Sequence, residues 1–152
     1  LARKVLFDTA KKSIHDPVWD GTDVTVGEEL LRPSVIYTPT VLKVLEQNQV
    51  KAIAHITGGG LPGNVNRVLP DDMDAEIRKG TWSPPRIFTE IQSLGNIDEG
   101  EMFKVFNMGI GMVLIVDQQS VDSTQEIIDA TGLSSTQIGT VKANGTGSVE
   151  IV

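Results

Sequence analysis

Segments with the apolar spacing of helices alternate along this chain with segments typical of β-strands, and this alternation limits the fold more than any other feature. A strand must bury at least one face and a helix one stripe, so alternating elements are most stable as helices packed on a sheet. The sequence therefore predicts an α/β or α+β sandwich, in which helices cover a mixed sheet.

The apolar periodicity and the turn residues also place the individual elements. Helices are expected near 1–14, 26–31, 39–48, from the loop 57–60 to 68, and at 86–94, 99–106 and 121–131. Strands are expected at 50–56, 74–78, 109–116, 137–142 and 148–152. The strand at 109–116 is apolar nearly throughout, which is typical of a fully buried strand. The segment 143–147, rich in Gly and Asn, predicts a hairpin between the last two strands.

The chain has 152 residues, which predicts a single domain over 1–152. It contains no cysteine, so disulfides, thiolate metal sites and cysteine nucleophiles are excluded. Two histidines leave little for a histidine-rich metal site, and the acidic cluster 71–76 lacks the spacing of a calcium loop. No metal site is therefore predicted on this chain.

The charge balance bears on partners and location. Thirteen basic and twenty acidic residues give a formal net charge of −7, and the basic residues do not cluster. Nucleic acids and acidic membranes are therefore poor partners. The longest apolar run, 112–116, is far shorter than a membrane-spanning helix, and no signal peptide opens the chain, so we expect a cytoplasmic protein. Because the chain opens with Leu1 inside an amphipathic helical pattern, we expect a fragment of a longer protein.

The strongest local feature is a triple-glycine loop, Thr57, Gly58, Gly59 and Gly60, between a predicted strand and a predicted helix. Without Cβ atoms the backbone N–H groups can approach a ligand closely, and a helix N-terminus favours an anion. Thr57 adds a hydroxyl, so the loop is a candidate phosphate site. A tight turn that needs positive φ is the alternative interpretation. The loop is neither a Walker loop nor a dinucleotide fingerprint.

Side chains around this loop complete the candidate site. His55 ends the predicted strand and could transfer protons, contact phosphate or serve as a hydrogen-bonded structural residue. Asn64 and Arg67 follow three residues apart on one helix face, where Arg67 could contact a phosphate or pair with a carboxylate.

A second glycine-bearing junction precedes the apolar strand. Asn107 and Gly109 belong to it, and Gly109 and Gly111 are expected on one face of the strand. Such a stripe admits either a ligand or another backbone at close range.

These stretches together resemble the C-terminal domain of the aminoimidazole ribonucleotide (AIR) synthetase family, the phosphoribosylformylglycinamidine cyclo-ligases. The resemblance covers nearly the whole chain in the right order. The matching segments are 1–6 (LARKVL), 31–37 (LRPSVIY), 54–61 (AHITGGGL), 64–70 (NVNRVLP), 85–88 (PRIF), 95–97 (GNI), 101–103 (EMF), 106–112 (FNMGIGM) and 137–141 (QIGTV). The chain departs from the family pattern at 61–63, after the glycines, and at 38–40, where a Lys usually precedes the Pro.

The resemblance implies an α+β fold, a mixed β-sheet flanked by helices and partly ferredoxin-like. It implies the substrate-binding half of a cytosolic, homodimeric enzyme of de novo purine biosynthesis, which uses ATP and Mg²⁺ to close formylglycinamidine ribonucleotide into aminoimidazole ribonucleotide. In that family the amide oxygen is activated, as an iminophosphate, before a nitrogen displaces phosphate. The N-terminal ATP-binding domain is then missing from this chain, and the chain alone is expected to be inactive.

Two other interpretations remain open. The chain could be a stand-alone binding or regulatory module for a phosphorylated metabolite. It could also be the equivalent domain of a related ATP-dependent enzyme, such as formylglycinamide ribonucleotide amidotransferase, thiamine monophosphate kinase or selenophosphate synthetase.

Overall fold

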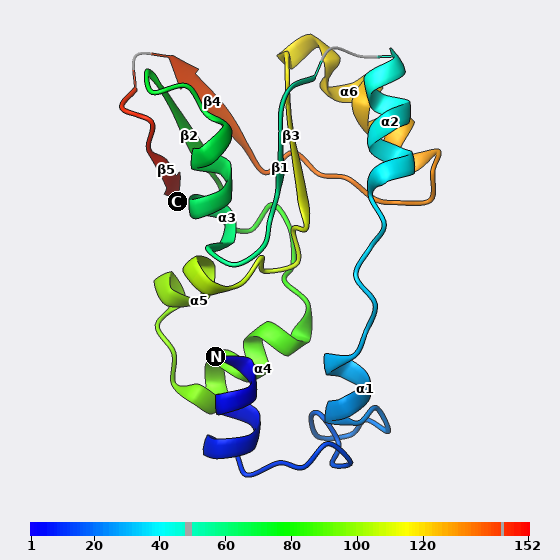
Figure 1. Ribbon diagram of the computed structural model, residues 1–152, viewed down its shortest axis with the longest axis vertical. Coiled ribbons are helices and arrows are strands. Elements are labelled where there is room, and N and C mark those ends of the chain that lie inside the picture. The colour runs from blue at the N-terminus through cyan, green and yellow to red at the C-terminus, as the bar shows by residue number, and fades with distance from the viewer. Residues whose placement is uncertain (48–49, 144) are drawn as a thin grey trace.

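The computed structural model describes residues 1–47, 50–143 and 145–152, and its strands form two small sheets surrounded by helices (Figure 1). In the first sheet β1 (Val50–His55) pairs antiparallel with β3 (Met112–Val116). In the second sheet β2 (Met73–Ile77) lies in the centre, antiparallel to β4 (Gly139–Ala143) and parallel to β5 (Val149–Ile151). The expected α+β architecture with a mixed sheet is confirmed, although the strands divide between two sheets.

The predicted hairpin between the last two strands is wrong. β4 and β5 both pair with β2, which separates them, so the connection crosses over the end of β2. The crossing is held by Asp74 of β2, whose carboxylate accepts hydrogen bonds from the backbone N–H groups of Thr146 and Ser148 at 2.7 and 2.8 Å. Asn144, which the hairpin signal included, lies outside the described residues.

The helices follow the predicted order. They are α1 (Val26–Leu30), α2 (Thr38–Gln47), α3 (Gly60–Val65), α4 (Arg86–Gly95), α5 (Glu99–Val105) and α6 (Val121–Asp129), with the 3-10 turns η2 (Asn66–Val68) and η3 (Gln118–Ser120). Asn48, the expected end of the second long helix, lies outside the described residues.

The first helix is shorter than the predicted 1–14. Its main part is a π-helical turn, η1 (Lys4–Thr9), and the chain then leaves the helix because Lys11 takes a left-handed φ of 56°. The Lys12 ammonium donates to the carbonyl oxygens of Pro17 and Val18, which draws this segment into the loop before α1.

One hydrophobic core takes buried residues from the helices η1, α1, α3, α4 and α5 and from the strands β1 and β2. Its fully buried side chains include Leu6 of η1, Leu61 of α3, Ile91 of α4 and Met102 of α5. Each of these helices presents an apolar face at helical spacing, which explains why the sequence pattern located them.

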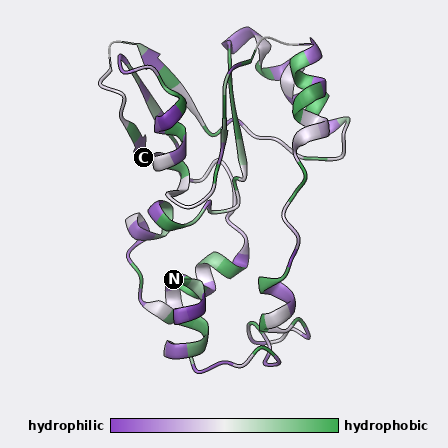
Figure 2. Ribbon diagram, in the orientation of Figure 1, coloured by the Kyte–Doolittle hydropathy of each residue, from purple (hydrophilic) through white to green (hydrophobic). Residues whose placement is uncertain are grey.

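Strand β3 is hydrophobic along its length but is not fully buried (Figure 2). All five of its residues are half-buried, and the strand begins at Met112, because the chain at Gly109 has a φ of 94°. The predictions of a fully buried strand from 109, and of Gly109 and Gly111 on one strand face, are therefore wrong.

Candidate functional site

The two glycine-bearing junctions meet at one end of the β1–β3 sheet. Antiparallel pairing puts His55, at the end of β1, opposite Met112, at the start of β3. One residue further on, the backbone N–H of Ile56 donates to the carbonyl oxygen of Gly111 at 2.9 Å. Segments 57–60 and 107–111, nearly fifty residues apart in sequence, thus lie side by side.

Asn64 organises the triple-glycine loop from inside. Its buried side-chain amide donates to the carbonyl oxygens of Gly60 at 2.7 Å and of Thr57 and Gly58 at 3.3 Å. Its carbonyl oxygen accepts from the Thr57 hydroxyl at 3.4 Å. The sequence predicts Asn64 as a ligand-contacting residue, and the structure shows its side chain turned toward the loop backbone.

The three glycines differ in what the backbone requires of them. Gly59 and Gly60 have φ values of 99° and 60°, which L side chains rarely adopt. At Gly60 a Cβ would also overlap the carbonyl oxygen of Phe103. Gly58 has neither constraint, since a Cβ there would meet no atom within 4 Å. Gly58 is therefore the glycine of the loop that neither backbone conformation nor packing requires.

Arg67 lies beside this loop and faces solvent. Its Nη1 is 3.4 Å from Asn64 Oδ1. Among the described carboxylates none forms an ion pair with Arg67. The sequence allows two roles for Arg67, contact with a phosphate and pairing with a carboxylate. The second role is not seen among the described residues.

The second junction is a turn held by hydrogen bonds and close packing. The side-chain oxygen of Asn107 accepts from the backbone N–H of Gly109 at 3.0 Å, and the carbonyl oxygen of Met108 accepts from the Trp82 indole at 2.9 Å. A Cβ at Gly109 would overlap the ring of Pro85. The glycine at this position thus permits close packing of backbone against Pro85.

Tyr37, which the sequence analysis did not select, joins the site. Its hydroxyl lies so close to Gly111 that a Cβ there would overlap it, and its ring stands edge-on to the His55 ring with centroids 6.3 Å apart. Burial raises the pKa of the Tyr37 phenol above its usual value, so the hydroxyl stays protonated near neutral pH. Two signals were present in the sequence: Tyr37 is the sole tyrosine of the chain, and it ends segment 31–37, one of the segments that carry the family resemblance.

A cavity of about 340 Å³ opens beside these two rings. It is lined by segment 34–38, Val41, Leu42, His55 and Met112. The same end of the sheet therefore offers a small cavity, an imidazole, a neutral phenol and a glycine loop next to a guanidinium.

Neither a metal site nor a membrane segment is found in the part of the chain that the structure describes. No group of three or more His, Cys, Asp or Glu side chains there could hold a metal ion. None of the described helices combines the length and apolarity needed to cross a bilayer.

Comparison with known proteins gives a consistent family and fold. The family described as "AIR synthase related protein, C-terminal domain" matches residues 1–152. The phosphoribosylformylglycinamidine cyclo-ligase of Syntrophus aciditrophicus is 44% identical over 95% of this chain and 42% of the relative. That of Caldicellulosiruptor bescii is 44% identical over 98% of this chain and 44% of the relative. The chain thus spans less than half the length of these relatives.

Among solved structures, the crystal structure of E. coli HypE, a hydrogenase maturation protein, matches with a TM-score of 0.61. The match covers 99% of this chain and 42% of that chain at 18% sequence identity. At that identity the likeness shows a shared fold.

Proposed function

Because the chain belongs to the family of AIR synthase related C-terminal domains, we propose that it is the substrate-binding half of an ATP-dependent phosphoribosylformylglycinamidine cyclo-ligase. The full-length enzyme would convert formylglycinamidine ribonucleotide to aminoimidazole ribonucleotide in the cytoplasm, as a homodimer. The observation that carries this proposal is 44% identity, over nearly the whole chain, to relatives of that name.

The glycine loop would bind the phosphate end of the substrate. The backbone N–H groups of Gly58 and Gly59 have no hydrogen-bond partner in the described part of the chain, and Gly58 leaves open space in front of them. Arg67 supplies a positive charge next to the loop, while the chain as a whole carries −7. Two free donors and one guanidinium are the groups that bind a phosphate against an unfavourable net charge.

His55 would orient the substrate or contact its phosphate. The Tyr37 ring packs against the imidazole, and no carboxylate among the described residues forms an ion pair with His55. A catalytic acid or base is usually oriented by such a partner. Asn107 and Gly109 would keep the turn between α5 and β3 in its conformation, and this turn would form one wall of the substrate site.

ATP and Mg²⁺ would be bound outside this chain. No group of three or more His, Asp or Glu side chains in the described part of the chain could hold a metal ion, so we place the carboxylates that hold Mg²⁺ in the rest of the full-length protein. The chain's own part in the reaction is to bind and orient the nucleotide substrate, and to exclude water from one side of it.

The proposal is tested with the full-length protein that contains this chain. Purified protein is incubated with formylglycinamidine ribonucleotide, ATP and Mg²⁺, and aminoimidazole ribonucleotide is quantified by chromatography alongside ADP. We expect one ADP per product. The isolated chain 1–152 serves as the control and should form no product. Failure of the full-length protein to form product would refute the proposed reaction, and turnover by the isolated chain would refute its assignment as a binding half.

A further inference from the structure

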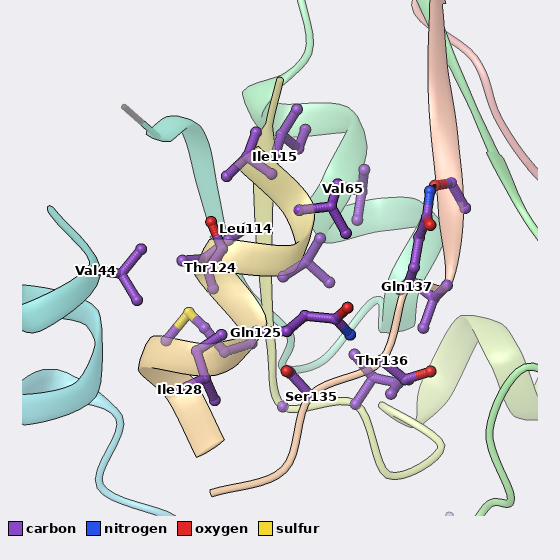
Figure 3. Close-up of a pocket in the computed structure, with 18 of the residues that line it drawn as sticks. Val44, Val65, Leu114, Ile115, Thr124, Gln125, Ile128, Ser135, Thr136 and Gln137 are labelled. Carbon is purple, nitrogen blue, oxygen red and sulfur yellow. Dashed lines mark hydrogen bonds between the residues drawn. The ribbon is translucent and has the colours of Figure 1, made fainter. Parts of the chain in front are cut away.

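A cavity of about 650 Å³ lies between β3, the helices α2 and α6, and the segment 133–141 (Figure 3). It lies between the β1–β3 sheet and the β4–β2–β5 sheet, and side chains of β3 line it. Protein interiors are normally packed without voids larger than a water molecule. A cavity of this size falls within the 300–1,000 Å³ typical of small-molecule sites, and it explains why the apolar strand β3 is only half-buried.

The walls of this cavity are mostly apolar, and the described residues that form them carry no positive charge. Val44, Val65, Leu114, Ile115 and Ile128 face it, and no Lys or Arg is among the described residues that line it. Glu76 is the one acidic side chain among these described residues, and it pairs with Lys142 and Arg78. Because an unpaired charge is costly to bury, phosphate and carboxylate ligands are disfavoured here.

Neutral polar side chains also line this space, and Ser135 and Gln125 are among them. The Ser135 hydroxyl is buried and has no hydrogen-bond partner among the described residues. Gln125 extends from α6 toward the segment that carries Ser135 (Figure 3). Buried polar groups in native proteins are almost always paired, so an orphaned hydroxyl at a cavity wall indicates a partner supplied by a ligand.

We propose that this cavity binds an uncharged purine-type base. The amide of a glutamine presents one acceptor and two donors, and it pairs in a bidentate manner with the N6 amino group and N7 of adenine. The Ser135 hydroxyl would form a further hydrogen bond to the ring, and the Val, Leu and Ile side chains would cover its faces. The cavity is thus a second site, separate from the phosphate-binding loop, and would exist whatever reaction the full-length protein performs.

The test measures adenine binding to the full-length protein by calorimetry and by saturation-transfer NMR. Gln125→Met replaces the amide with an apolar side chain of similar shape, and we expect adenine to bind at least about tenfold more weakly. Ser135→Ala should weaken binding by about three- to tenfold. Gln119→Met, at an exposed position on η3 that does not line the cavity, should leave the affinity unchanged. Thermal unfolding of each variant checks that it is folded.

Unchanged adenine affinity in Gln125→Met would overturn the proposal. If Gln125→Met does not fold, unchanged affinity in Ser135→Ala would overturn it instead. Absence of adenine binding to the wild-type protein would also overturn it. AMP should bind this site more weakly than adenine. If AMP bound as tightly as adenine, and if Gln125→Met abolished that AMP binding, the requirement for an uncharged ligand would be refuted.

Discussion

Gly58 and Gly60 lie two residues apart in one loop and meet opposite surroundings. Gly60 is buried against the carbonyl oxygen of Phe103 with a left-handed φ, while Gly58 faces open space. The sequence predicts a glycine loop at this place but cannot separate a turn requirement from a binding requirement. The separation depends on what packs against each Cα, and Phe103 is more than forty residues away in sequence.

Gly60→Ala is therefore expected to destabilise the fold by about 2–5 kcal/mol, from backbone strain and overlap with Phe103. Gly58→Ala, the matched control, should change the free energy of unfolding by less than about 0.5 kcal/mol. Denaturant unfolding followed by circular dichroism measures both. Equal stability of the two variants would contradict the packing described for Gly60.

Gly58→Val is expected to raise KM in the full-length enzyme by about tenfold or more, because a side chain there would block access to the loop N–H groups without disturbing the fold. It is a cleaner test than Gly59→Val, since Gly59 has a φ of 99° and a β-branched residue would strain the backbone there. Steady-state kinetics with formylglycinamidine ribonucleotide provides the measurement. A normal KM in a stably folded Gly58→Val enzyme would end the phosphate-loop hypothesis.

At the scale of elements, local pattern locates the helices and strands but not the pairing of the last strands. The composition of 143–147 favours a hairpin turn, since Gly and Asn are the residues that such turns require. The pairing is decided instead by Asp74, which binds the backbone of this connection across the end of β2. No local rule relates a carboxylate to N–H groups more than seventy residues away.

Asp74→Asn is expected to weaken the attachment of β5 and to reduce stability at neutral pH. Hydrogen bonds from the backbone N–H groups of Thr146 and Ser148 hold the pKa of the Asp74 carboxyl below its ordinary value of 3.8. Because the folded-state pKa is the lower one, the stabilisation is fully present well above pH 3.8 and is lost as the pH falls through the folded-state pKa.

Unfolding midpoints measured between pH 2 and pH 7 check this expectation. The variant should be less stable than the wild type near pH 7 and should approach it at the acidic end. Asp72→Asn is the control, because Asp72 contacts Gly145 through its backbone carbonyl oxygen, which the substitution leaves in place. A wild-type-like pH profile for Asp74→Asn would contradict the anchoring role.

At the scale of the whole molecule, an apolar strip remains uncovered. It runs from the end of α1 to α2 and consists of Leu31, Val35, Ile36, Leu42 and Leu45, with Leu31 and Ile36 exposed by 83% and 79%. Several large apolar side chains left exposed along one segment favour association. The strip is where we expect contact with other parts of the full-length protein.

The isolated chain 1–152 is therefore expected to fold cooperatively but to self-associate as its concentration rises. Ile36→Lys should shift it toward monomer, while Val152→Lys, at an exposed apolar position outside the strip, should not. Sedimentation velocity over a hundredfold concentration range measures this. A wild-type chain that stays monomeric throughout would count against an uncovered association surface.

The central position of β2 in its sheet has a consequence for the order in which the protein can be made. Both partners of β2 come from residues 139–151, so β2 has no strand beside it while residues 78–138 are being synthesised. At typical translation rates that interval of about 60 residues lasts roughly 3–12 s. During that time neither edge of β2 can be covered by its own sheet, and a chaperone that shields open β-edges would have this segment as a substrate.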